Sequence, residues 1–379
     1  MGPVDLFVIG YEGMKQQLTE QGYDVAGTGL RSWEKQSRLY RRLTRLLGGR
    51  AETLWRLWAG PRIDYQADPE LAGNVSGVVQ RGGYDVVVGR YLSASAQAGL
   101  FELQGVPVVV DIDDADTNVL HARIASPATP RWLAWFLSLR LRAVERWQRQ
   151  LWPKASMVWL SNAGDVSLAP HRRHALIPNI PYTMPERAGL SPSAPASRVV
   201  LWVGSFEHRV NLDGIELFLQ DVWPEIVRRD PGLVFRVIGG GLPAKKRQQW
   251  MRLPNVQVIG FAESLRTHYE QCALSVVPLF DGAGTKIKVL ESLAYRRTCV
   301  VTAHSIRGYE SFLRDGESLR VVATLDALAD PIIELANAPE LRQRMEQAGR
   351  DIVETMCPPA AMHEKVAQAM RALQTRGAP

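Results

Sequence analysis

The sequence has 379 residues, which is long for one hydrophobic core and favours two domains. Three scattered cysteines exclude a disulfide framework, and no apolar run approaches the roughly 20 residues of a transmembrane helix. The first residues lack the basic and apolar parts of a signal peptide, so we expect a cytoplasmic protein. The net charge of +6 favours anionic partners such as nucleotide phosphates or an anionic membrane surface.

Two segments, 31–62 and 131–152, mix arginine with tryptophan at helical spacing. Such helices can lie in a membrane interface, with their apolar face down and their arginines on anionic headgroups. A core-facing helix with a solvated basic face explains the same pattern, so association with the inner face of the membrane stays open. Nucleic acid is not an expected partner, because no nucleic-acid-binding module is recognisable.

Short apolar runs alternate with longer helical patterns along the chain. Continuous apolar runs are typical of parallel strands buried on both faces, and their alternation with helices predicts a doubly wound α/β fold. The expected strands are Leu6–Ile9, Asp85–Val88, Val106–Val110, Met157–Leu160, Val199–Val203, Val234–Ile238, Val256–Ile259, Leu274–Val277 and Cys299–Thr302.

Four aspartates lie within Asp111–Asp116, directly after an expected strand. A buried pair formed by Asp113 and Asp114 could share a proton, which raises one carboxyl pKa and suits an acid/base role. Alternatively, Asp113 positions a substrate hydroxyl, or one aspartate caps the next helix while the others are solvated. Asp111 and Asp113 also form an Asp-x-Asp pattern that could hold a divalent metal against a diphosphate.

A segment rich in proline, serine and alanine near 181–198 has the composition of a linker. It divides the chain into two comparable halves. We therefore expect an N-terminal domain over 1–182, a linker over 183–198 and a second domain over 199–345. The last residues, 346–379, are predicted to be helical and could pack back on the first domain.

The segment Val277–Ala294 predicts a strand, a glycine-containing loop and a helix that begins near Thr285. Gly282 and Gly284 would let the backbone approach a ligand, and the helix N-terminus favours an anion. Thr285 adds a hydroxyl, Lys288 a cation and Glu291 a carboxylate that can accept hydrogen bonds from a ribose. A plain strand–loop–helix connection with surface charges explains the local pattern equally well.

Further glycine turns follow other expected strands, at Gly204–Ser205, Gly239–Gly241 and Gly260–Phe261. If the strands are parallel, these turns lie at their carboxyl ends, where open α/β sheets bind ligands.

Residues 85–379 resemble GT-B glycosyltransferases of family 4. The resemblance is carried best by GFAESLRTHYEQCALSVVPLFDGAGTKIKVLESLAYRRTCVVTAHSIRGYE and by LWVGSFEHRVNLDGIELFLQDVWPEI, and more weakly by GVPVVVDIDDAD. It implies two Rossmann-like doubly wound domains that face each other across a cleft. The first would bind the acceptor and the second a nucleotide-sugar donor, without an obligatory metal or cofactor.

The same resemblance implies roles for single residues. Gly204 would lie by the donor phosphates, Lys288 would contact phosphate, Glu291 would bind the ribose, and Gly260 and Phe261 would border the base. Arg209 is a further candidate for a phosphate-binding cation, and Ser205, Gly282, Gly284 and Thr285 complete the expected donor site.

The sequence departs from the family pattern at three places. Ala283 stands where the family often has a glutamate for the sugar ring, and Arg296–Thr298 replaces Gly-x-Pro. Asp113, with Asp114 as its partner, stands where many members have His-Asp, which leaves inversion open beside the implied retention of anomeric configuration.

The expected function is therefore sugar transfer from a UDP- or GDP-sugar to a glycan, a lipid-linked sugar or a small molecule, with retention and without metal. Three alternatives remain: a metal-dependent GT-A-like transferase using Asp111 and Asp113, a non-catalytic nucleotide-sugar-binding protein, and a sugar-nucleotide epimerase.

Overall fold

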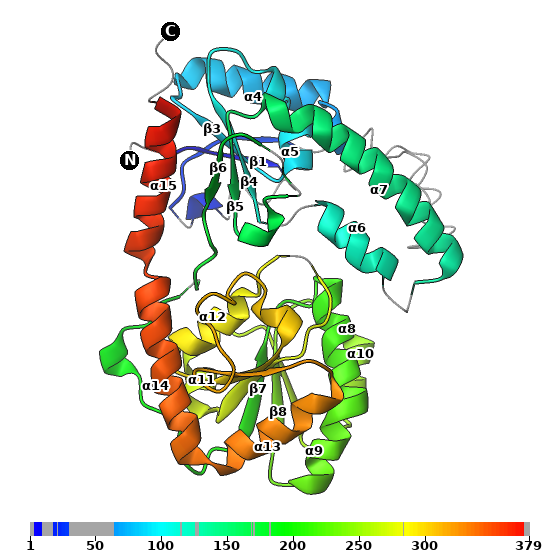
Figure 1. Cartoon of the computed structure of the whole chain (residues 1–379), viewed down its shortest axis with the longest axis vertical. Helices are drawn as coiled ribbons and strands as arrows, with labels where there is room; N and C mark the ends of the chain where they lie inside the picture. Colours follow the sequence, from blue (N-terminus) through cyan, green and yellow to red (C-terminus); the bar gives the residue numbers. More distant parts are fainter. Residues whose placement is uncertain are drawn as a thin grey trace. The chain divides into compact units, whose positions relative to one another are not determined.

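The computed structural model describes residues 4–9, 18–20, 22–29, 64–113, 116–125, 129–167, 169, 171–181, 183–282 and 284–374. The chain divides into two compact units, Met1–Ile177 with Lys365–Pro379, and Pro178–Glu364 (Figure 1). The predicted basic segment 31–62, Asp114 and Ala283 lie outside the described residues.

The first unit is built on parallel strands. Its main sheet has the order β3-β4-β5-β6, and β1 pairs with β2. The strands are β1 (Leu6–Ile9), β2 (Val25–Gly29), β3 (Val87–Arg90), β4 (Val108–Ile112), β5 (Met157–Leu160) and β6 (His174–Leu176), and the helices are α4 (Pro69–Gly82), α5 (Leu92–Gln97), α6 (Asp116–Ala125), α7 (Arg131–Leu151) and the end of α15 (Pro359–Gln374).

The central strands β4 and β5 of the first unit's main sheet are buried on both faces, as their apolar runs predict. Val108 and Val110 of β4 belong to a core with α4, α5 and α7, whereas Val109 packs with Ala369 of α15. The alternation of β4 side chains between two cores requires helices on both sides, which is the doubly wound arrangement.

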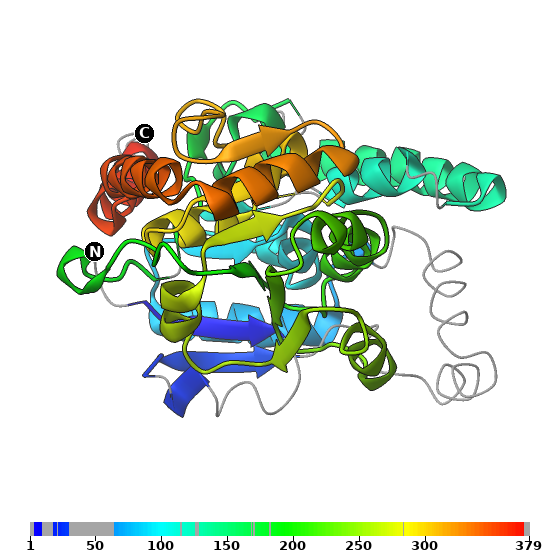
Figure 2. The same cartoon turned by 90° about the horizontal axis from the view of Figure 1, so that it is seen from below.

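The second unit has one six-stranded sheet of order β12-β11-β10-β7-β8-β9, in which every pair is parallel. Figure 2 shows its strands running between layers of helices. Its elements are β7 (Val199–Val203), α8 (Arg209–Leu217), α9 (Trp223–Arg229), β8 (Val234–Ile238), α10 (Ala244–Trp250), β9 (Val256–Gly260), α11 (Arg266–Gln271), β10 (Leu274–Val277), α12 (Ile287–Ala294), β11 (Cys299–Thr302), β12 (Arg320–Val322), α13 (Ala329–Asn337) and α14 (Pro339–Met356).

Parallel pairing determines where the glycine turns of the second unit lie. The loops after β7, β8, β9 and β10 all leave the carboxyl ends of neighbouring strands, so they meet at one edge of the sheet. Both faces behind this edge are filled by apolar side chains, with Trp202 in one core and Leu201 in another. The sheet is a rigid base for the loops.

The proline-rich segment before β7 is bonded to the second unit along its length. Long side chains of that unit donate to its backbone carbonyls: Arg350 to Pro185 (2.7 Å), Arg266 to Gly189 (2.7 Å), Arg296 to Leu190 (3.3 Å), Arg297 to Ser191 (3.0 Å), Gln343 to Ser193 (2.9 Å) and Arg342 to Ala194 (2.9 Å). We call Pro185–Ala194 the strap. Apart from a short 3-10 turn at Arg187–Gly189, the strap forms no helix or strand, so these donors satisfy its backbone carbonyls.

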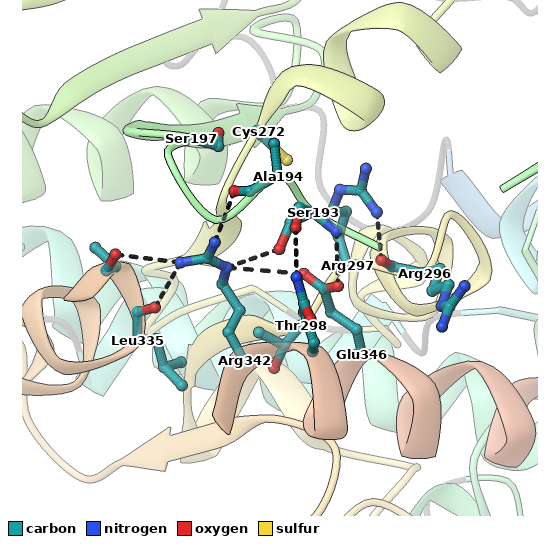
Figure 3. Close-up of polar contacts among 12 residues, drawn as sticks. Ser193, Ala194, Ser197, Cys272, Arg296, Arg297, Thr298, Leu335, Arg342 and Glu346 are labelled. Carbon is teal, nitrogen blue, oxygen red and sulfur yellow. Dashed lines mark hydrogen bonds and ion pairs between the residues drawn. The ribbon is translucent and has the colours of Figure 1, made fainter. Parts of the chain in front are cut away.

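Arg342 and Glu346 of α14 are the buried centre of the strap contacts (Figure 3). The Arg342 guanidinium donates to Ser193 Oγ at 2.7 Å and to the carbonyls of Leu335 and Ala194, while Glu346 accepts from the Ser193 N–H at 2.9 Å. Burial raises the pKa of Glu346 and lowers that of Arg342. Each charge therefore depends on the other and on the strap.

Replacement of Arg342 by methionine should destabilise the second unit. It removes one of the two cations, Arg342 and Arg297, that act on the buried Glu346, and it removes donors from several buried carbonyls, which costs about 3 kcal/mol or more. Thermal unfolding followed by circular dichroism measures this as a lower midpoint. Arg228→Met is the control, since Arg228 forms an exposed pair with Glu225 and should change the midpoint little. Equal midpoints for the two variants would contradict the role given to Arg342.

Candidate functional site

Three glycine turns of the second unit lie in direct contact. The Gly204 N–H donates to the Ile238 carbonyl at 3.0 Å, and the Gly239 N–H donates to the Gly260 carbonyl at 2.8 Å. A Cβ atom on Gly239 would lie 1.8 Å from the Gly204 carbonyl oxygen, so no other residue fits there. The turns after β7, β8 and β9 thus form one continuous backbone surface at the sheet edge.

The side chain of Lys288, on α12, extends to this backbone surface and lies against Gly204. A Cβ atom on Gly204 would lie 2.8 Å from its ammonium nitrogen, which lies 4.8 Å from the centre of the Trp202 ring. The ammonium also donates to Asn211 Oδ1 at 2.7 Å. The structure therefore brings Gly204 and Lys288 together, as the predicted phosphate site requires.

The pKa of Lys288 falls to about 7, from an ordinary value of 10.5. Burial is the main cause, the nearby charge of Lys286 adds to it, and Glu291 opposes it. A lysine ammonium held in such surroundings gains more from an anion than an exposed one does, because the anion supplies the charge that water no longer screens.

The loop after β10 is held from inside by Lys286. Its buried ammonium donates to the carbonyls of Gly282 at 3.0 Å and Gly284 at 3.1 Å, and His304 Nε2 lies 2.7 Å from the Gly282 carbonyl. Gly282 and Gly284 have φ angles of +95° and +76°, which favour glycine. Sequence reasoning missed Lys286, because one more lysine in a polar loop looks like a surface residue.

Glu291 lies one turn beyond Lys288 on α12 and is 8% exposed. It accepts a hydrogen bond from Tyr269, whose ring stacks on Tyr295 with 4.5 Å between centres. Burial raises the pKa of Glu291, whereas Tyr269 and Lys288 act to lower it. The carboxylate is thus held in a fixed place beside Lys288.

The remaining predicted donor residues occupy different surroundings. Thr285 Oγ1 accepts from Asn179 at 2.7 Å, Ser205 Oγ accepts from the Glu207 N–H at 3.3 Å, and Phe261 is 78% exposed next to Gly260. Arg209 begins α8 but pairs with Asp213 at 2.8 Å on an exposed face. Its charge is already compensated, and the structure does not place it with Lys288.

In the first unit, Asp111 and Asp113 lie at the end of β4 and share a cation. Arg90 of the neighbouring strand contacts Asp111 at 3.3 Å and Asp113 at 2.9 Å. Burial raises the pKa of Asp111, Arg90 acts to lower it, and the charge of Asp113 raises it further. Sequence reasoning missed Arg90, because parallel pairing of β3 with β4 is what brings it beside the aspartates.

Two further features mark this end of the first sheet. Tyr91, directly after Arg90, has a φ of +63°, a strained conformation that is concentrated at functional sites. Within the described part of the chain, no group of three or more His, Cys, Asp or Glu side chains is arranged to hold a metal ion. Arg90 fills the position between the two carboxylates that a bridging cation would take.

Most of the second unit is similar to a known protein family. Residues 197–338, from β7 to α13, match the family described as glycosyl transferases group 1. This part of the chain is therefore similar to glycosyltransferases of group 1. No curated protein matches the chain in sequence.

Solved structures show the same fold. Sucrose-phosphate synthase from Thermosynechococcus elongatus is similar with 18% identity and a TM-score of 0.65, over 81% of this chain and 78% of that one. HepE from Anabaena, in complex with UDP, has 13% identity and a TM-score of 0.65 over 97% and 92%. TarM has 13% identity and a TM-score of 0.61, and the match covers 79% of this chain but only 58% of TarM. The chain therefore has the predicted GT-B fold.

Removal of the Lys288 charge should weaken UDP binding, and wild-type affinity should fall with rising pH. The ammonium is charged below its pKa of about 7 and neutral above it, so affinity measured by calorimetry should decline between about pH 7 and 9. Lys288→Ala should bind UDP at least tenfold more weakly at pH 6.5, since charged hydrogen bonds contribute about 1.5–3 kcal/mol. The UDP affinity of Lys288→Ala should also depend much less on pH between about pH 7 and 9. A wild-type UDP affinity that stays constant over this pH range would contradict the role assigned to Lys288.

Proposed function

We propose that the glycosyltransferase moves a sugar from a UDP-sugar to a sugar or lipid-linked sugar acceptor, with retention of anomeric configuration and without a metal or other cofactor. One observation carries the proposal. The Lys288 ammonium lies against Gly204 at the carboxyl edge of a parallel sheet, where a diphosphate would meet both. The solved structures of HepE contain UDP and, in one case, UDP with glucose, which supports a uridine nucleotide rather than GDP.

The chemistry proposed for this site is control of charge. As the bond from the anomeric carbon to the diphosphate breaks, negative charge grows on the leaving oxygen. The N-terminus of α12 has no side-chain cap, because Lys286 at the cap position makes no capping hydrogen bond. Lys288 and this helix N-terminus would stabilise the negative charge on the leaving oxygen. Glu291 would accept hydrogen bonds from the ribose, and Phe261 with Gly260 would border the base.

The first unit would bind the acceptor. Asp113 is proposed to accept a hydrogen bond from the attacking hydroxyl, with Asp114 as its predicted partner. Arg90 would orient the Asp113 carboxylate through its 2.9 Å contact. Because Arg90 also compensates Asp111, the pair has less need of a metal than two free carboxylates would.

Replacement of Asp113 by asparagine should lower turnover much more than it weakens UDP-sugar binding. The amide keeps the shape of the side chain but accepts a proton poorly, and loss of acid/base help costs roughly 100-fold or more. The assay follows UDP release with and without sugar acceptors, in the presence and absence of EDTA. Activity that survives EDTA supports the metal-free proposal.

Two results would replace this proposal by a competing one. Abolition of turnover by EDTA and its recovery with Mn²⁺ would favour a metal site at Asp111 and Asp113. UDP-sugar binding without release of UDP under any condition would favour a nucleotide-sugar-binding protein, for which the loss of the family glutamate at Ala283 gives a reason.

We further propose that α7 rests on an anionic membrane surface, which would suit a lipid-linked acceptor at the inner face of the cell membrane. Its first half exposes Trp132 (61%), Trp135 (60%), Phe136 (45%) and Leu139 (43%), while Leu137, Leu141 and Val144 face the core. Within the described residues, no helix is long and apolar enough to cross a membrane. Figure 1 shows α7 alongside α6.

Vesicle sedimentation checks this second proposal. The protein should sediment with vesicles that contain phosphatidylglycerol and much less with phosphatidylcholine alone, and added salt should release it. Trp132→Ser with Trp135→Ser should abolish sedimentation without loss of UDP binding, whereas Met251→Ser, an exposed apolar change in the second unit, should leave it intact. If the variant with both tryptophans replaced sediments with vesicles as wild type does, α7 is not the membrane-binding surface.

A further inference from the structure

Asn211, in the first turn of α8, uses both ends of its side-chain amide. It is 7% exposed. Its Nδ2 donates to the Ser205 carbonyl at 2.6 Å, and its Oδ1 accepts from the Lys288 ammonium at 2.7 Å. An ammonium can only donate and a carbonyl can only accept, so the orientation of this amide is fixed by its partners.

The Asn211 amide links the two halves of the predicted phosphate site. Ser205 belongs to the turn after β7, next to Gly204, and Lys288 belongs to α12, which follows β10. The ring of Trp202 lies beneath the ammonium at 4.8 Å, and Gly204 leaves the space that the ammonium fills. The flexible four-carbon stem of lysine allows many conformations, so without the amide oxygen the ammonium could move away from Gly204.

We propose that Asn211 is a positioning residue that holds the Lys288 ammonium at Gly204, where it meets the donor diphosphate. This inference rests on the proposed function of the site. An amide suits the task because it orients the ammonium without cancelling its charge. A carboxylate at 211 would form an ion pair with Lys288 and compete with the diphosphate for it.

The charged groups around Lys288 make the difference between amide and carboxylate measurable. Lys286 acts to lower the pKa of Lys288, and Glu291 acts to raise it. Asn211 and Trp202, which contact the ammonium from α8 and β7, carry no charge. A carboxylate in place of the Asn211 amide would therefore add a second anion beside the ammonium and raise the pKa of Lys288.

The test compares three variants of the full chain with wild type in UDP binding by calorimetry between about pH 6 and 9. Asn211→Leu keeps the volume and removes both hydrogen bonds. Asn211→Asp keeps the shape and adds charge. Asn337→Leu is the control, because Asn337 contacts Asp230 and Arg198 at the amino edge of the same sheet. Circular dichroism establishes that each variant is folded.

The expected result has three parts. Asn211→Leu should bind UDP about tenfold more weakly at pH 6.5. Asn211→Asp should also bind more weakly there, but its affinity should decline less between pH 7 and 9 than that of wild type, because the ammonium stays charged. Asn337→Leu should follow wild type.

Two outcomes are distinguishable failures. If wild type binds UDP and both Asn211 variants match its affinity and pH profile, this inference is overturned while the proposed function stands. If folded wild type binds neither UDP nor GDP, the proposed function fails and the inference fails with it. Should Asn211→Leu not fold, the altered pH profile of Asn211→Asp decides the question alone.

Discussion

The contact between the backbones of Gly204 and Gly239 is the constraint from which the site follows. A Cβ atom at 239 would lie 1.8 Å from the Gly204 carbonyl oxygen, so the turns after β7 and β8 can approach this closely only without side chains. Their approach leaves bare backbone at the sheet edge and an opening above Gly204. Lys288 fills that opening from α12, which is how a lysine on a helix behind β10 comes to lie beside the end of β7.

Burial of the Lys288 ammonium costs hydration free energy, and contacts with neighbouring side chains offset part of that cost. A partly buried ammonium loses hydration, which is why the pKa of Lys288 falls to about 7. The face of Trp202 and the oxygen of Asn211 return part of the lost interaction without supplying a full negative charge. The positive charge of Lys288 is therefore only partly compensated, and a diphosphate can compensate it further. A stable sheet is needed to keep the ammonium in this position. The strap and the buried Arg342–Glu346 contacts stabilise the same unit.

Much of the second unit could be predicted from its sequence because its strands are continuous apolar runs. Val199–Val203, Val234–Ile238, Leu274–Val277 and Cys299–Thr302 are strands with the predicted bounds. The predicted closeness of Gly204 and Lys288 follows from the same logic, since parallel strands collect their carboxyl ends at one edge. The match of residues 197–338 to group 1 glycosyltransferases agrees with the predicted class of enzyme, and the solved structures confirm the GT-B fold.

Residue pairs that depend on how neighbouring elements pack could not be predicted. Arg90 reaches Asp113 only because β3 lies beside β4, and Asn211 reaches Lys288 only because α8 and α12 begin at the same sheet edge. Arg209, a candidate phosphate ligand by family resemblance, pairs with Asp213 one turn along α8, a contact that the sequence alone does not reveal. The composition of the strap predicted a linker and contained no sign of the distant arginines that bind it.

A crystal structure of the protein with UDP tests the central claim most directly. We expect a diphosphate oxygen within hydrogen-bond distance of the Lys288 ammonium and next to Gly204, with the ribose hydroxyls bound by Glu291. A UDP molecule bound elsewhere, or one that leaves Lys288 without a phosphate in reach, would contradict it.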